Sequence, residues 1–123
     1  MTTTTQKTDF ITIPSVGRVA SYSLDPLNRV HVASLIRRAE AYFSLSAKAW
    51  ESGNNSGNAA TLRASEVEER ETAANGEALL APLGIKCDWP GLYPSFEVGG
   101  FHEYTTEAAV LAALGHPRNW LTS

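Results

Sequence analysis

Apolar residues return at every third or fourth position between Leu27 and Trp50. This spacing places them in one stripe along a helix of about seven turns, with a largely polar opposite side. Asp25 and Pro26 suit the N-cap and the first helical position, because aspartate accepts unpaired backbone N–H groups and proline lacks one. The pattern predicts a helix that begins here and ends near Gly53, before a turn rich in asparagine and glycine. The stripe consists of Leu27, Val32, Leu35, Ile36, Ala39, Phe43, Ala47 and Trp50.

A second run of strong helix formers extends from about Ala59 to Leu80. The dipeptide Asn75-Gly76 is its weak point, costing about 1 kcal/mol relative to alanine, and is where a bend or break is expected. Because a short Gly/Asn/Ser turn separates the two helices, they should pack antiparallel as a hairpin. The apolar side expected for this second helix is mostly small: Ala60, Ala64, Val67, Ala74 and Ala78, with Leu79 and Leu80 at its end.

Shorter segments flank the helices. Residues 1–9 are polar and threonine-rich, which predicts a frayed end. Phe10 to Pro14 alternates as a short strand does, and a further extended piece is expected after Gly17. The segment from Ile85 to Trp89 also alternates and predicts a strand.

Residues 95–104 predict a β-hairpin that turns at Gly99-Gly100, since glycine supplies the positive φ that such turns need. Thr105 is expected to cap a last helix, which Gly115 ends. The register expected for the hairpin places Val98 opposite Phe101, Glu97 opposite His102, and Phe96 opposite Glu103.

These elements predict an α+β fold over residues 10–123, in one domain: an N-terminal extended segment, a long antiparallel helical hairpin, and a small antiparallel sheet covered by a short C-terminal helix. The 123 residues fit a single domain, and the 43% apolar content is ordinary for a globular protein. The most apolar stretch, Ala108 to Leu114, is far too short to span a membrane. With no apolar leader and with Cys87 as the single cysteine, the expected location is cytoplasmic.

Candidate catalytic groups are few and common. Cys87 lies near His102 and near Glu97 or Glu103 in the sequence, so a small Cys/His-dependent enzyme is one alternative. The histidines lack the i,i+3 or i,i+4 spacing of a helical metal site, and no phosphate loop or nucleophile elbow is present. Glutamates between 66 and 71 indicate a solvated helix face. The sequence therefore predicts neither a metal nor a cofactor.

A second alternative is nucleic-acid binding through the first helix. Its basic residues are Arg29, Arg37, Arg38 and Lys48, which could follow a phosphate backbone. The net charge of −3 disfavours nonspecific DNA binding, and Tyr42 is the only aromatic residue placed beside them for stacking. Nucleic acid is therefore a less favoured partner than protein.

The most distinctive composition lies between residues 89 and 104, where aromatic side chains stand among prolines and glycines. Tyrosine and tryptophan are favoured at interfaces because they bury much area at low entropic cost. The same residues also suit a core, with Phe96, Val98 and Phe101 inward and Tyr93, His102 and Tyr104 outward. The residues predicted to bind a partner are Trp89, Tyr93, Phe101, His102 and Tyr104.

No stretch carries a motif specific enough to assign a family. The favoured hypothesis is a small non-enzymatic regulator or inhibitor that binds another protein, of the kind that phages and plasmids encode as accessory proteins. A homodimer is also expected to be possible, if the sheet leaves the wide apolar face of the first helix uncovered.

Overall fold

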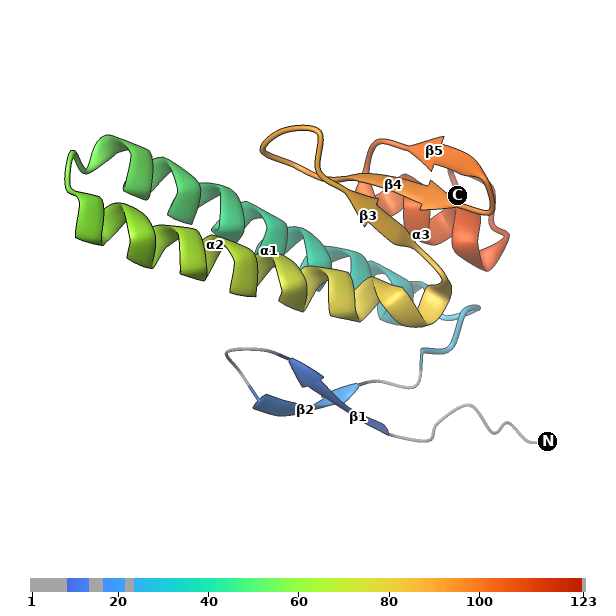
Figure 1. Ribbon diagram of the computed structural model, residues 1–123. Helices are drawn as coiled ribbons and strands as arrows, with labels where there is room; N and C mark the ends of the chain where they lie inside the picture. The colour runs from blue at the N-terminus through green and yellow to red at the C-terminus, as the bar shows by residue number, and fades with distance from the viewer. Residues whose placement is uncertain (1–8, 14–16, 22–23, 123) are drawn as a thin grey trace.

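The computed structural model describes the backbone of residues 9–13 and 17–21 and the whole of residues 24–122, which form an α+β fold (Figure 1). Two long helices lie side by side, and a three-stranded sheet with a short helix covers one side of the pair. A two-stranded hairpin lies on the other side. In chain order the elements are β1 (Asp9–Ile13), β2 (Gly17–Ser21), α1 (Arg29–Asn55), α2 (Ala59–Leu80), the 3₁₀ helix η1 (Ala81–Leu83), β3 (Lys86–Asp88), β4 (Ser95–Val98), β5 (Phe101–Glu103) and α3 (Thr106–Leu114).

The N-terminal extended segment is confirmed as an antiparallel pair, β1 with β2. Of the residues expected to fray, Asp9 opens β1, and the others lie outside the described residues. Among the residues that the structure describes, no helix combines the length and the apolar character needed to cross a membrane.

Helix α1 begins at Arg29, three residues later than Pro26, and its N-cap is Asn28 rather than Asp25. The Asn28 side chain accepts from the backbone N–H groups of Val30 and His31, so it satisfies two of the unpaired donors at the helix start. Asp25 instead accepts from the Leu27 N–H in a local turn. The expected cap was wrong because two competent cap residues stand three positions apart, and Leu27 consequently lies outside the helix, 76% exposed.

The other end of α1 also differs, since the helix continues through Gly53 to Asn55. Gly53 is buried where α1 and α2 approach each other, and a Cβ atom built on it would lie 2.7 Å from Cβ of Ser65. This glycine therefore serves close helix packing and does not end the helix. A few residues earlier, the Ser46 hydroxyl donates to the backbone oxygen of Glu69, 2.9 Å away, and joins the helices again.

Helix α2 has the expected bounds but neither breaks nor ends at Asn75-Gly76. Gly76 is buried, and a Cβ atom there would lie 2.5 Å from Cε1 of Phe43. The absent side chain makes room for the phenyl ring. The small apolar side expected for α2 was wrong in its first half, because Ala60, Ala64 and Val67 are exposed.

Replacing Gly53 or Gly76 by alanine is expected to lower the free energy of unfolding by about 1–3 kcal/mol, because the added methyl group overpacks the helix contact. In an open helix the same change stabilises by about 1 kcal/mol, so the sign of the effect reports the close approach. Urea unfolding followed by circular dichroism measures it, with the exposed neighbour Ser52→Ala as the control. A gain in stability in both glycine variants would contradict the packing described here.

The three-stranded sheet has the order β3-β4-β5 and is antiparallel throughout. The β4–β5 register is the one expected from the sequence, with Glu97 opposite His102. Gly99 and Gly100 turn the hairpin with φ values of 56° and 85°. Thr105 caps α3 by accepting from the Ala108 N–H at 3.1 Å, and Gly115 ends that helix with a φ of 77°.

The hydrophobic core lies between the start of α1, the end of α2, the sheet and α3. Phe43 is at its centre: its ring meets the Trp89 ring edge-on at 5.6 Å and the Phe96 ring at 5.9 Å. The sheet and α3 thus cover this part of the apolar α1 face, for which a second copy of the chain was expected only if the sheet left it uncovered. The buried residues of this core are Val32, Ile36, Ala39, Phe43, Leu79, Leu80, Ile85, Phe96, Ala109, Val110 and Leu111.

The C-terminal tail returns to the start of α1, which the sequence did not predict. The rings of His116 and Trp120 are stacked, with centroids 3.8 Å apart. The guanidinium carbon of Arg29 lies 4.9 Å from the centre of the Trp120 ring, and Arg29 Nε donates to the Trp120 carbonyl oxygen at 2.9 Å. A cation over an indole face is attracted by the ring quadrupole, so this contact fixes both Arg29 and the tail.

Candidate protein-binding site

Two exposed tyrosines line the same hollow although they come from different connections. Tyr93 belongs to the loop between β3 and β4 and is 57% exposed, whereas Tyr104 joins β5 to α3 and is 79% exposed. The hollow has a volume of about 310 Å³, and the buried rings of Phe43 and Phe96 contribute to its lining. We call it the tyrosine hollow; it is lined by Glu40, Phe43, Tyr93, Pro94, Phe96, Tyr104, Thr105 and Thr106.

Local structure holds both tyrosines in place. Pro94 is buried and directly precedes β4, so the backbone next to Tyr93 is restricted in φ and packed against the core. Tyr104 stands between the last residue of β5 and Thr105, the N-cap of α3. Both side chains are therefore exposed on rigid supports, which reduces the entropy that a binding partner would have to remove.

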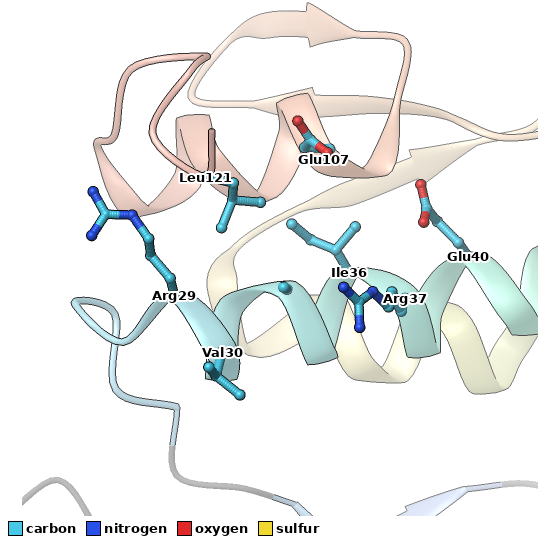
Figure 2. A pocket seen from close by; sticks show the side chains of 8 residues that line it. Arg29, Val30, Ile36, Arg37, Glu40, Glu107 and Leu121 are labelled. Atoms are coloured by element: carbon cyan, nitrogen blue, oxygen red, sulfur yellow. The ribbon is translucent and has the colours of Figure 1, made fainter. Parts of the chain in front are cut away.

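A second hollow adjoins the first, because Glu40 lines both. It has a volume of about 440 Å³ and lies between α1, α3 and the C-terminal tail (Figure 2). Ile36 and Glu40 rise from α1 towards α3, and Leu121 descends from the tail. We call it the arginine hollow; it is lined by Arg29, Val30, Ala33, Ile36, Arg37, Glu40, Glu107 and Leu121.

Two carboxylates, those of Glu40 and Glu107, line the arginine hollow, and Glu40 also lines the tyrosine hollow. Partial burial raises the pKa of Glu40, and the negative charge of Glu107 raises it further. Neither carboxylate forms an ion pair with any residue that the structure describes. The arginine hollow thus contains two carboxylates and two guanidinium groups, whereas Glu40 is the single charged residue among those that line the tyrosine hollow.

The remaining aromatic residues predicted to bind a partner lie elsewhere. Trp89 is half-buried on the α2 side, where it packs on Phe43 and its Nε1 donates to Glu77 Oε1 at 2.6 Å. His102 is exposed on the sheet face opposite Phe96. Of the five residues named from the sequence, the structure thus brings together only Tyr93 and Tyr104.

Phe101 was expected to point inward and does not lie in the core, since it is 75% exposed. It pairs with Val98 and so projects from the same sheet face as Phe96, but it stands at the turn of the outermost strand. The alternation predicted its face correctly. At this edge of the sheet the described residues leave the Phe101 ring largely exposed.

The basic residues of α1 do not form one stripe. Arg37 and Lys48 share a helix face about 16 Å apart, whereas Arg38 is turned about 100° from Arg37. Arg29 contacts Trp120, and Arg37 lines the arginine hollow beside Glu40. Two of the four cations thus lie in a seam that also contains carboxylates, and nucleic-acid binding stays a prediction of the sequence.

Cys87 and His102 lie on opposite faces of the sheet. Cys87 is paired with Phe96, which is paired with Glu103, whereas His102 is paired with Glu97. Since paired residues share a face and neighbours alternate, the sheet separates the thiol from the imidazole. In the described part of the chain, no group of three or more His, Cys, Asp or Glu residues is placed to hold a metal ion.

Comparison with protein-family models, with curated proteins and with solved structures finds no match to this chain.

Sequence reasoning missed Glu40 and Glu107 as members of the candidate site. Glu40 lies at the edge of the helical stripe among basic residues, and Glu107 stands in the first turn of α3, where it complements the helix dipole. No sequence signal places the two together, because they are 67 positions apart and meet only when α3 packs on α1.

Proposed function

We propose that this chain is a small cytoplasmic protein-binding regulator whose recognition site is the tyrosine hollow, extended by the arginine hollow along the α1–α3 seam. The observation that carries the proposal is the convergence of Tyr93 and Tyr104, two largely exposed rings, on one hollow with a rigid aromatic floor. Exposed aromatic anchors on a preorganised support are the residues that most often dominate a protein interface.

The size and the lining of the hollows support a protein partner. Their volumes, about 310 and 440 Å³, lie at the lower end of small-molecule pockets and suit single side chains of a docked segment. Their linings combine aromatic, aliphatic and charged residues, as protein interfaces do, with an aromatic centre and charged flanks. The outer sheet face is a weaker candidate, since its paired residues Lys86, Glu97 and His102 are polar.

Replacing both tyrosines of the tyrosine hollow by alanine should abolish binding of the partner protein. The variant Tyr93→Ala plus Tyr104→Ala is expected to lose specific partners captured from a host lysate, because each exposed anchor at an interface centre contributes about 2 kcal/mol or more. Partners are compared by quantitative mass spectrometry at equal protein stability. Phe101→Ala is the matched control, since it removes an exposed ring from the same hairpin outside the hollow. Retention of every partner by the double variant would refute this site.

A further inference from the structure

The tyrosine hollow has the chemistry of a site for a cationic side chain. Four of its lining residues are aromatic, the exposed Tyr93 and Tyr104 and the buried Phe43 and Phe96, and Glu40 is the single charged one. Aromatic faces attract cations through the ring quadrupole, and the attraction grows as water is excluded. A carboxylate at the same hollow adds a charged hydrogen-bond acceptor for an ammonium or guanidinium group.

The local charge strengthens this preference. The negative charge of Glu107 acts on Glu40, and neither carboxylate has an ion-pair partner within the described residues. Partial burial and this repulsion both raise the pKa of Glu40. A bound cation would offset the repulsion from Glu107 and compensate the charge of Glu40. The chain as a whole is also acidic, with a net charge of −3, so a basic partner segment is favoured over long range.

The N-terminus of α3, which is the positive end of its dipole, lies at the tyrosine hollow and by itself would favour an anion there. Two features oppose it: the Thr105 hydroxyl already accepts from the Ala108 N–H, and Glu107 supplies negative charge in the first turn. Arg29 and Arg37, like Glu107, line the arginine hollow and not the tyrosine hollow, where Glu40 is the single charged lining residue. Negative charge therefore dominates where the aromatic rings are.

We infer that the partner presents a lysine or arginine side chain, which enters the tyrosine hollow between Tyr93 and Tyr104 and meets Glu40. This inference rests on the proposed function and names the partner chemistry of that site. The aliphatic stem of either residue would contact the tyrosine rings, while its charged end reaches the carboxylate.

Short capped peptides test the inference without knowledge of the partner. A pentapeptide with one central arginine among glycines is titrated into the full chain and followed by amide chemical shifts. Its citrulline counterpart keeps the shape without the charge, and lysine and norleucine versions form a second pair. We expect shifts confined to the hollow, dissociation constants on the order of millimolar, and about three- to fivefold tighter binding of each cationic peptide than of its neutral counterpart.

Variants of the chain identify the residues that contact the bound peptide. Glu40→Gln is expected to weaken the arginine peptide about three- to fivefold and to leave the citrulline peptide unchanged. Glu51→Gln is the matched control, because it makes the same charge change on the same side of α1, about 16 Å away. Tyr93→Ala and Tyr104→Ala should each weaken the arginine peptide similarly, and their exposed positions should preserve the fold.

Three results would overturn the inference. They are equal binding of the charged and neutral peptides, chemical-shift changes centred outside the hollow, or tighter binding of a peptide with a central glutamate than of the arginine peptide. The proposed function is tested separately. If the double tyrosine variant loses its partner while Glu40→Gln retains it at full strength, the site stands and the cationic occupant is wrong. If arginine peptides bind in the hollow but the double variant keeps every partner, the proposed function is wrong.

Discussion

Replacing Phe43 by alanine is expected to lower the free energy of unfolding by about 3–5 kcal/mol, the loss typical of a large aromatic side chain removed from a core. The ring is 3% exposed and joins three elements: it fills the space above Gly76 of α2, meets Trp89 edge-on and packs on Phe96 of β4. A small domain has only about 5–15 kcal/mol of stability, so this loss is a large part of the total.

Chemical denaturation of Phe43→Ala measures the effect. Leu45→Ala on the same helix is the control, since Leu45 is 52% exposed and its truncation should change stability by less than about 1 kcal/mol. Phe43→Leu, which refills part of the space, should lose less and keeps the comparison possible if the alanine variant does not fold. Equal effects at positions 43 and 45 would show that Phe43 is not the centre of the core.

Cys87 is expected to resist alkylation in the folded protein. Burial raises the pKa of the Cys87 thiol to about 12, and the nearby negative charge of Glu77 contributes to the same shift. Because the thiolate is the reactive form, this pKa leaves roughly a thousandfold less of it near neutral pH than an unperturbed cysteine has. Iodoacetamide labelling followed by mass spectrometry should therefore be slow in buffer and fast in denaturant.

The raised pKa of the Cys87 thiol also makes the stability of the fold depend on pH. Below about pH 9 the thiol is neutral in both the folded and the unfolded chain, so Cys87 does not affect stability there. Between about pH 9 and pH 12 the unfolded chain ionises first, so stability falls as the pH rises. The variant Cys87→Ser removes this loss. Glu77→Gln, which keeps an acceptor for Trp89, should speed alkylation moderately, and rapid labelling of the native wild-type protein would contradict the raised pKa.

The raised pKa of Cys87 also concerns the alternative function predicted from the sequence, a small Cys/His-dependent enzyme. A nucleophilic cysteine needs a lowered pKa and a base within hydrogen-bond reach. Cys87 has a raised pKa, and His102 projects from the other face of the sheet. A Cys87–His102 pair is thus not assembled in this fold.

The sequence by itself determined the local structure. The three- and four-residue spacing of apolar side chains predicted the first helix, and a run of strong helix formers predicted the second. Alternation with Gly99-Gly100 predicted the β4–β5 hairpin in its observed register. These features depend on interactions between residues close in the chain, which a periodic pattern records. The same locality explains the error at the start of α1, where Asp25 and Asn28 are both good caps and only the folded geometry selects one.

Tertiary structure decided which glycines end a helix and which permit close packing. Gly53 and Gly76 looked like helix breakers, yet each lies against a neighbouring side chain that leaves no space for a Cβ atom.

Tertiary structure also decided which residues form the candidate site. Tyr93 and Tyr104 could be identified as exposed aromatics from the sequence, but the hollow between them exists only because Phe43, Phe96 and Glu40 meet there from distant parts of the chain. Contacts across such separations are set by the packing of whole elements, for which no local pattern in the sequence is a sufficient guide.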